Sequence, residues 1–498
     1  MHDVIHAVLG NFDSLYFLMI IAGAAGGMIV GALPGFTATM GVAIFVPFTY
    51  YMSTNSAMAF LIALYCAAVY SGSIPAILIR TPGTPAAIAT INDGYPMAQK
   101  GFAGKALGIA SYASVLGGII SVVILALTSG VLAKAALKFG PQEYFALTLL
   151  GLSMVVGMSE GDPTKGFVSM FLGLVITLPG LTVNSGYPRF VFGNDNLLSG
   201  IELLPVMIGV FAISEVLHGI VHAQESKPVK QSIDGIVGSI RFFKGKTFLT
   251  IKSSFIGTFL GALPGVGAVT AAFMGYNEAQ RTSKHPELMG SGTEEGIIGP
   301  EAANNGVTGG AMIPLLSLGI PGDAVTAILL GALMVQGVRP GPELFSKNLD
   351  VVYGIYSSMI ISYIAILVLS MCFIRILVRV IEVPSRLLYP FIIVFCLIGS
   401  YALRGSFFDV GVAIIFGLIG YIMRENRFPI GPMTLAIILG SLMEYKLTIA
   451  LSLSRGNWLT FINRPISGLI ILATIVFLVV SFLKEIKNRR RKSKSLTS

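Results

Sequence analysis

The chain is short of charge: only 11% of its 498 residues are Asp, Glu, Lys or Arg. A soluble domain carries about 25%, so this chain has too few charges to cover a water-facing surface. Hydrophobic residues make up 54%, and apolar stretches long enough to cross a hydrocarbon core of roughly 30 Å recur along the whole length. The composition argues against a soluble multi-domain enzyme and predicts a polytopic membrane protein.

Groups that would perform catalysis or bind metals are also scarce. The three cysteines, Cys66, Cys372 and Cys396, lie in apolar runs without paired spacing, which predicts buried thiols, no disulfide and no metal site. No Gly-x-x-x-x-Gly-Lys-Ser/Thr loop is present, which argues against ATP as the energy source. His218 and His222 lie four residues apart beside a basic stretch; two potential ligands are a weak metal signal, and an interfacial helix is the better interpretation.

The positive charges, net +9, are unevenly distributed. They concentrate in a connector at 221–248 and in a tail at 484–498, which follows an apolar run, whereas the first basic residue is Arg80. Under the positive-inside rule the connector and the C-terminus are predicted to be cytoplasmic. We expect the N-terminus to be periplasmic, without a cleavable secretory signal.

Glycine and proline, in contrast, are abundant (58 and 24) and recur in a pattern. The pentapeptide Gly-Ala-Leu-Pro-Gly occurs at 31–35 and again 230 residues later at 261–265. Each copy precedes a second interrupted apolar segment, at 74–83 and at 313–322, where the matching prolines 75 and 314 are 239 residues apart. Hydrophobic segments interrupted at corresponding positions of two halves are the best sequence indication of a secondary transporter's binding site.

These landmarks predict an all-α polytopic fold of two repeats, 1–220 and 249–455, followed by an extra helix at 456–483. We expect about 11 or 12 transmembrane helices plus re-entrant hairpins. Assigning the basic loops to the cytoplasm gives the two repeats opposite orientations, although Lys134 and Lys138 then lie on the outer side. The predicted fold is therefore a pair of inverted repeats with broken helices.

A helix that ends inside a membrane leaves backbone N–H groups unpaired, and these groups favour anions. Small hydroxyl side chains beside the breaks add donors, so a pseudo-symmetric pair of breaks suits a substrate with carboxylates at both ends. The alternative is that the glycines only permit tight helix packing. The predicted substrate-binding residues are Gly35, Thr37, Thr39, Thr81, Gly83 and Thr84 in the first half, and Gly265, Gly267, Thr270 and Gly322 in the second.

Four further residues have two interpretations each. Arg80, just before the second break, could hold a carboxylate bidentately or extend to the lipid interface. Asn304 and Asn305 could bind a ligand, through oxygens to a coupling cation or amides to a carboxylate, or could cap a helix at the membrane surface. Asp323 could cap the next helix or complete a cation or proton site. Other acidic residues are interpreted as a solvated loop (Glu294, Glu295, Glu301) or as interfacial (Glu215, Glu444).

Three motifs resemble one known family. They are Gly299 to Gly306 (GPEAANNG), Pro314 to Gly322 (PLLSLGIPG) and Asp93 to Ala98 (DGYPMA). Together with the repeated pentapeptide they resemble the TctA family, the large membrane subunit of tripartite tricarboxylate transporters, over residues 15 to 455; Gly306 replaces a frequent alanine.

The resemblance implies import of a citrate-like carboxylate across the bacterial inner membrane by alternating access. It also implies a small TctB-like membrane subunit, a periplasmic TctC-like binding protein and a sodium or proton gradient. A passive anion channel and a polytopic membrane enzyme are the alternatives.

Overall fold

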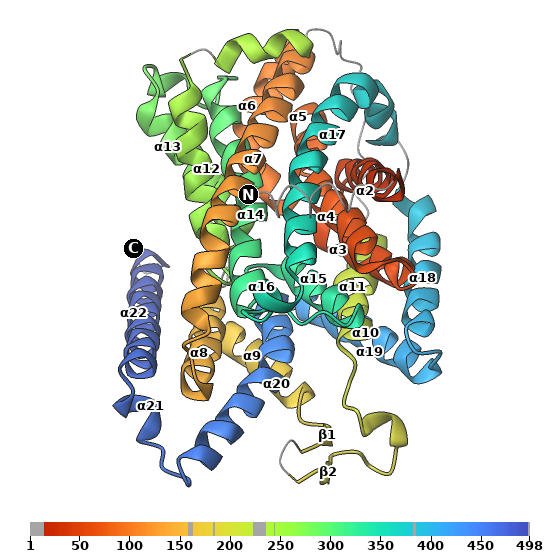
Figure 1. Cartoon of the computed structure of the whole chain (residues 1–498). Helices are drawn as coiled ribbons and strands as arrows, with labels where there is room; N and C mark the ends of the chain where they lie inside the picture. The colour runs from red at the N-terminus through yellow and green to blue at the C-terminus, as the bar shows by residue number, and fades with distance from the viewer. Residues whose placement is uncertain are drawn as a thin grey trace.

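The computed structural model describes residues 14–157, 163–182, 185–222, 236–243, 245–381 and 385–496. Apart from a two-stranded hairpin, these residues form helices and connecting turns (Figure 1). The first half contains α2 (Ser14–Ala32), α3 (Ala38–Phe45), α4 (Thr54–Ser71), α5 (Ser73–Ile79), α6 (Ile88–Met97), α7 (Ala103–Ala136), α8 (Pro141–Gly157), α9 (Pro163–Ile176), β1 (Gly180–Leu181), β2 (Pro188–Arg189), α10 (Leu203–Met207) and α11 (Ser214–Val221). The second half contains α12 (Thr247–Gly261), α13 (Gly267–Thr282), α14 (Glu295–Leu318), α15 (Ala324–Val335), α16 (Leu344–Lys347), α17 (Leu349–Ile381), α18 (Ser385–Ala402), α19 (Phe407–Glu425), α20 (Ile430–Leu453), α21 (Thr460–Asn463) and α22 (Pro465–Leu496).

Within the described residues, seven helical segments are long and apolar enough to cross a membrane. They are Ser14–Ala32, Thr54–Ile79, Pro85–Ala136, Leu203–Val221, Leu349–Arg379, Phe407–Glu425 and Ile430–Leu453. The count is lower than the 11 or 12 predicted, because several apolar helices, including α9, α15 and α18, have shorter apolar stretches. The central helix α14 is not among the seven. The prediction of an all-helical membrane protein is thus confirmed, at the level of seven candidate spans.

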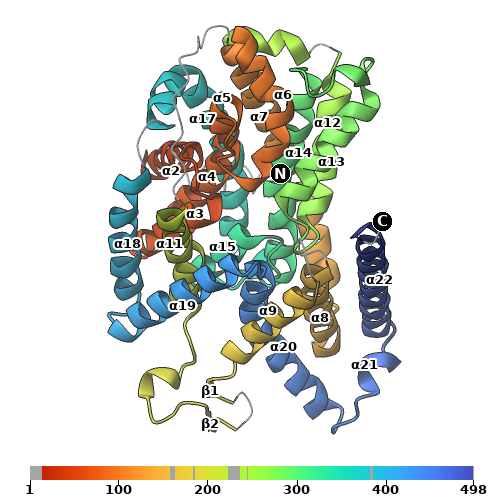
Figure 2. The same ribbon diagram turned by 180° about the vertical axis from the view of Figure 1, so that it is seen from behind.

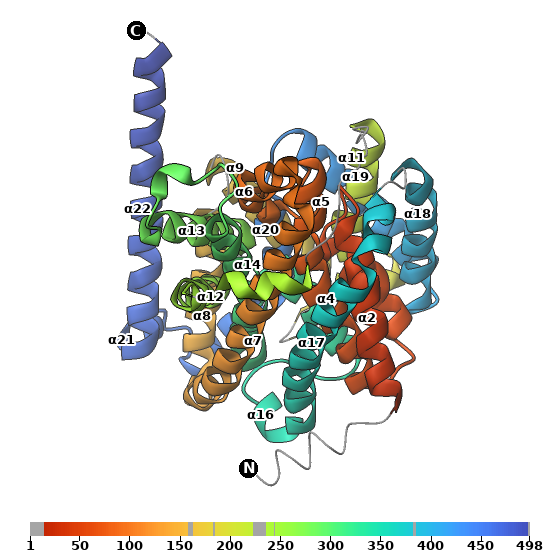
Figure 3. The ribbon, with the colours of Figure 1, turned by 90° about the horizontal axis from the view of Figure 1, so that it is seen from above.

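Large apolar side chains point outward from several long helices. Leu127 on α7, Phe259 on α12 and Leu469 on α22 are each exposed over more than 60% of their surface. Exposed apolar surface repeated around a bundle is what a lipid environment stabilises, since lipid tails are themselves apolar. Helix α22 lies at the edge of the bundle and packs against α8 (Figure 3).

The two halves bring their helices together in the same way. Gly27 and Gly31 of α2 lie against the backbone carbonyls of Leu64 and Ala68 on α4. In the second half, Gly257 and Gly261 of α12 lie in the same way against Ala303 and Val307 on α14. The pairs correspond at the offsets of 230 and 239 residues found in the sequence. Small residues of this kind let helix backbones approach closely, so the alternative interpretation of the glycines holds for these helix contacts.

The close approach predicts a sharp difference between two adjacent glycines. A Cβ at Gly27 would lie closer than 3.0 Å to the Leu64 carbonyl, whereas one at Gly26 would have no atom within 4 Å. We expect Gly27→Ala to separate α2 from α4 and to cost about 1–3 kcal/mol, as overpacking does. Gly26→Ala should be neutral or slightly stabilising, since alanine favours helix. Thermal unfolding of the purified protein in detergent compares the two; equal melting temperatures would contradict the packing.

Two ends of the bundle can be distinguished. Figures 1 and 2 place α6 and α13 toward one end and the β1–β2 hairpin and α21 toward the other. Within the predicted basic connector, residues 223–235 and 244 lie outside the described residues. Of the basic tail, only the backbone is described, as far as Leu496.

Candidate substrate and ion site

The first break of each half has the same backbone conformation. Helices α2 and α12 end just before Gly35 and Gly265, whose φ angles are +84° and +82°. Glycine suits this left-handed region because it has no Cβ. The prediction that both pentapeptides interrupt a helix is confirmed.

The second break of each half packs onto the first. A Cβ at Gly83 would overlap the carbonyl oxygen of Gly31, and a Cβ at Gly322 would overlap that of Gly261. In the second half the Gly265 N–H also donates to the Gly322 carbonyl at 3.1 Å. The four predicted breaks therefore meet in two pairs, one pair in each half.

Helices α5 and α14 end in matching left-handed caps. Arg80 has φ of +58° and Gly319 has φ of +73°. The next residues, Thr81 and Ile320, donate their N–H groups to the carbonyls of Pro75 and Pro314 at 3.4 and 3.2 Å. A non-glycine residue in this conformation costs roughly 1–2 kcal/mol. Such strain is a reason to look for a function in the Arg80 side chain.

The two halves meet through a buried polar contact. The Tyr65 hydroxyl on α4 donates to Asp323 Oδ2 at 2.8 Å. At the 239-residue offset, Tyr65 corresponds to Asn304, and Asp323 corresponds to Thr84. By this offset, the pair that corresponds to Tyr65 and Asp323 is Asn304 of the second half and Thr84 of the first. In agreement, α14 packs against the short turn Pro85–Ala87 that follows Thr84.

Asn304, its neighbour Asn305 and Thr84 carry buried polar atoms without partners in the described structure. Asn304, Asn305 and Thr84 are exposed by 1%, 0% and 6%, yet both amide atoms of Asn304, Oδ1 of Asn305 and Oγ1 of Thr84 have no hydrogen-bond partner among the described residues. Each such buried group costs about 1–3 kcal/mol. Buried polar atoms without partners are candidates for contact with a ligand.

The location of the two asparagines corrects one interpretation. Asn304 and Asn305 lie in the middle of α14, so they do not cap a helix at the membrane surface. Asp323, in contrast, is the N-cap of α15 and forms a reciprocal capping box with Thr326. Its carboxylate therefore occupies the N-terminus of α15, as one of its two interpretations expected. At the corresponding position, Thr84 makes no capping hydrogen bond.

The remaining predicted substrate residues lie on the helices after the first breaks. Thr37 caps α3 by accepting from the Met40 N–H at 3.1 Å. Gly267 begins α13 with φ of +73°. Thr39 and Thr270 are half-buried and, among the described residues, make no side-chain hydrogen bond. Their hydroxyls are therefore available.

The acidic residues differ from the sequence interpretation. Glu301 is fully buried and accepts from Thr90 at 2.5 Å and Ser114 at 2.8 Å, so it is not part of a solvated loop. Glu294 is half-buried between Lys105 and Lys246, each at 2.6 Å. Burial by itself would raise the pKa of Glu294, but the two lysines lower it below its usual value. Glu215 and Glu444 are paired with Arg424 and Arg189.

Asp93 is an important residue that the sequence analysis did not single out. Its fully buried carboxylate accepts from the Tyr276 hydroxyl and from the backbone of Gly290, Gly292 and Thr293, at 2.7–3.1 Å, and from the Thr293 hydroxyl. It thereby joins α6 of the first half to the loop before α14. Its place in the DGYPMA motif was the available signal.

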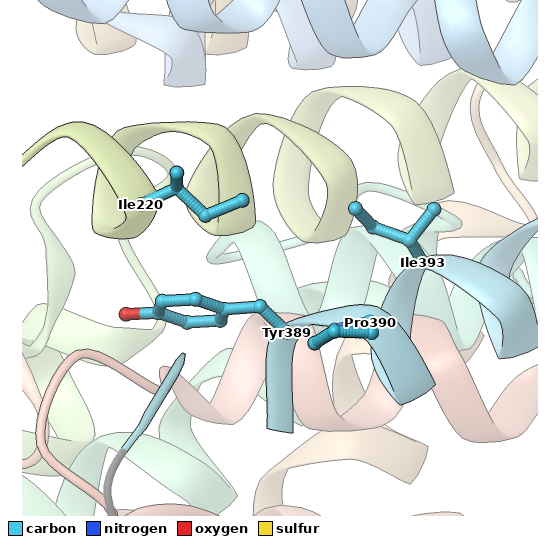
Figure 4. A pocket seen from close by; sticks show the side chains of 4 residues that line it. All are labelled: Ile220, Tyr389, Pro390 and Ile393. Carbon is cyan, nitrogen blue, oxygen red and sulfur yellow. The ribbon is translucent and has the colours of Figure 1, made fainter. Parts of the chain in front are cut away.

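Other cavities and clusters lie away from this center. One groove, lined by Ile220, Tyr389, Pro390 and Ile393, is apolar except for the tyrosine hydroxyl (Figure 4). Its described lining residues offer no charge to hold a carboxylate. His218 and His222 lie with Glu425, their ligand atoms within 4.8 Å of one another. His218 Nδ1 is 2.9 Å from Glu425, so an ion pair when histidine is protonated accounts for this contact.

The broken helices around a buried polar center define a multi-pass membrane transporter, and comparison with known proteins identifies its family. Residues 17–435 match the tripartite tricarboxylate transporter TctA family. The chain therefore belongs to this family, which is a transporter family and not an enzyme family.

Two relatives are known from Agrobacterium vitis. An uncharacterized 52.8 kDa protein in the TAR-I ttuC' 3' region is 35% identical over 466 residues, which cover 94% of this chain and 93% of the relative. An uncharacterized protein in the TAR-II ttuC' 3' region is 36% identical over 234 residues, 47% of this chain and 97% of that relative. No solved structure matches the chain significantly.

Proposed function

We propose that this chain is the permease subunit of a binding-protein-dependent secondary transporter. It imports a tricarboxylate or a related citrate-like carboxylate across the bacterial inner membrane, using a sodium or proton gradient and alternating access. The observation that carries this proposal is the set of unpartnered buried atoms of Asn304, Asn305 and Thr84, which belong to helix α14 and to the second break of the first half. Family membership supports the transport class, and a TctB-like small subunit and a TctC-like periplasmic binding protein complete the assembly.

The free atoms suggest how the roles are divided. A carboxylate would accept from the Thr84 hydroxyl, from the Asn304 amide N–H₂ and from backbone N–H groups near Gly35 and Gly265. A cation would take oxygen from Asn304, Asn305 and Asp323, since hard cations prefer oxygen ligands. Because both ends of the Asn304 amide are free, this residue can contact the anion and the cation together.

The topology completes the proposal. The two halves would be inverted repeats, with the C-terminus cytoplasmic and the N-terminus periplasmic. The matching breaks support the internal repeat, and the separation of α6 from α21 supports two distinct sides (Figure 1). Single cysteines replacing Lys134 and Arg379 should react with an impermeant thiol reagent from opposite sides. Reaction of both from one side would contradict the inversion.

Uptake by reconstituted protein tests the function. Proteoliposomes containing this chain and its small partner subunit should accumulate labelled citrate only with the purified binding protein and an imposed sodium or proton gradient. Failure with citrate but success with a dicarboxylate would change only the substrate. Flux that needs neither gradient nor binding protein would overturn the proposal and favour a passive anion channel.

A further inference from the structure

Arg80 lines an open cavity of about 730 Å³. The cavity is lined by the end of α5, by α6 and the turn after it, by α13 and by the loop before α14. Its polar lining residues include Arg80, Asn92, Tyr95, Gln99, Lys100 and Tyr276, while Asn304, Asn305 and Thr84 are not among the residues that line it. Both halves of the protein therefore contribute to its walls.

The cavity presents two positive charges without an acidic partner. Among the described residues, the Arg80 guanidinium contacts only the Tyr95 ring, 5.9 Å from its centroid. Lys100 donates to the Ser291 carbonyl at 2.7 Å and forms no ion pair in the described structure. Nearby cations differ: Lys105 and Lys246 pair with Glu294, and Lys252 and Arg281 pair with Glu278.

The nearest carboxylate does not neutralise the cavity. Asp93 follows Asn92 in sequence, but its side chain is fully buried and is held by the Tyr276 hydroxyl and the amides of the 290–293 loop. In the described residues, the side-chain amides of Asn92 and Gln99 are exposed and have no hydrogen bond. The accessible groups are therefore cations and amide donors.

A second polar cavity provides a useful comparison. It is lined in part by Arg404, Asp409 and Glu202, and Arg404 is already bound by Asp409 at 2.9 and 2.7 Å and by Glu202 at 2.8 Å. An incoming anion would have to displace these carboxylates. The cavity at Arg80 has no such internal competitor.

The cavity also lies close to the central site along the chain. Arg80 and Thr84 are four positions apart in the sequence, and a chain of that length spans at most about 14 Å. We propose that the cavity is a second, weaker site for the transported carboxylate, which occupies it at the cytoplasmic mouth after leaving the center. Arg80 binds it through its planar fork, and Lys100, Asn92 and Gln99 add charge and donors.

This inference rests on the proposed function for the identity of the anion and on the proposed topology for the side. A site this open is screened by salt, so citrate should bind weakly and less well at high ionic strength. The proposed site also accounts for the left-handed backbone of Arg80, because that conformation lets a side chain at the end of α5 line the cavity.

Cysteine protection tests the second site directly. In a Cys372→Ser background, where Cys66 and Cys396 remain buried, Asn92→Cys is labelled with an impermeant thiol reagent in inside-out vesicles of neutral lipid. We expect millimolar citrate to slow labelling several-fold, whereas methanesulfonate at equal ionic strength should not. Protection should persist in an Asn304→Leu variant and disappear when Arg80→Gln and Lys100→Gln are combined. His285→Cys, at an exposed position outside the cavity lining, is the control and should be insensitive to citrate.

The other outcomes separate the two proposals. No protection in a preparation that is active in uptake would overturn the second site and leave the transport function intact. Loss of protection with Asn304→Leu alone would also overturn it, since citrate would then act only through the center. Protection without any gradient-driven uptake would retain the anion site and remove the transport proposal. If phosphatidylglycerol alone reproduced the protection and abolished the citrate effect, the cavity would be a lipid headgroup site.

Discussion

Replacing Asn304 with leucine is expected to abolish uptake without destabilising the protein. The side chain is buried inside α14 and neither of its amide atoms has a partner among the described residues. Leucine has similar size and removes two unsatisfied polar atoms, so the melting temperature should stay equal or rise. In the loaded state, two hydrogen bonds to charged ligands are worth about 3 kcal/mol or more, which corresponds to a loss of about 100-fold or more in transport.

Three comparisons sharpen this prediction. Asn196→Leu makes the same exchange at an exposed position and should leave uptake unchanged. Thr84→Val should also reduce uptake while preserving stability, and combining it with Asn304→Leu should cost less than the sum, because both residues would serve one ligand. A fall in melting temperature together with uptake would mean that Asn304 is satisfied in the folded protein and is structural.

Replacing Asp93 with alanine is expected to have the opposite signature, a loss of stability. The carboxylate accepts hydrogen bonds from five groups, three of them backbone amides. Hydrogen bonds to a charged group contribute about 1.5–3 kcal/mol each, and the three amides would be left without their acceptor. We expect a loss of about 4 kcal/mol or more, a large fraction of the 5–15 kcal/mol typical of folded domains.

The yield and melting temperature of the purified variant measure this effect. The stability of Asp93→Asn should be intermediate, because asparagine keeps one acceptor oxygen but places an N–H₂ donor against the donors that surround Asp93. Asp195→Asn, at an exposed position, should leave the protein unchanged. If Asp93→Ala folded with wild-type stability and lost only uptake, the carboxylate would be part of the transport pathway instead of a structural link between the halves.

Much of the architecture was accessible from the sequence, and for definite reasons. Glycine and proline act locally, so the breaks at Gly35, Gly83, Gly265 and Gly322 could be predicted from spacing alone. The long apolar helices such as α7 and α17 follow from hydropathy in the same way. The structure gives seven candidate spans where 11 or 12 were expected, because several apolar segments form helices shorter than a full span.

The polar residues were harder to predict, because their partners are distant in the chain. Glu301 follows two acidic residues and was expected in a solvated loop, but Thr90 and Ser114 enclose it from the first half. The backbone N–H of Gly290, which donates to the Asp93 carboxylate, lies nearly 200 residues later in the chain. The sequence analysis grouped Arg80 with the helix breaks. Only the structure shows that Arg80 lines a cavity to which Asn304 does not contribute.

The capping of α15 by Asp323 makes the two related halves chemically unequal. One of two equivalent helix ends is occupied by the chain's own carboxylate, while the other presents the free Thr84 hydroxyl. Under the proposed function, an anion would find only the helix end at Thr84 free, and a cation bound at Asp323 would reduce the repulsion between that anion and the Asp323 carboxylate. Binding of the carboxylate would then require a cation to balance the charge of Asp323. An Asp323→Thr substitution would give both halves a threonine at this position and would remove that requirement.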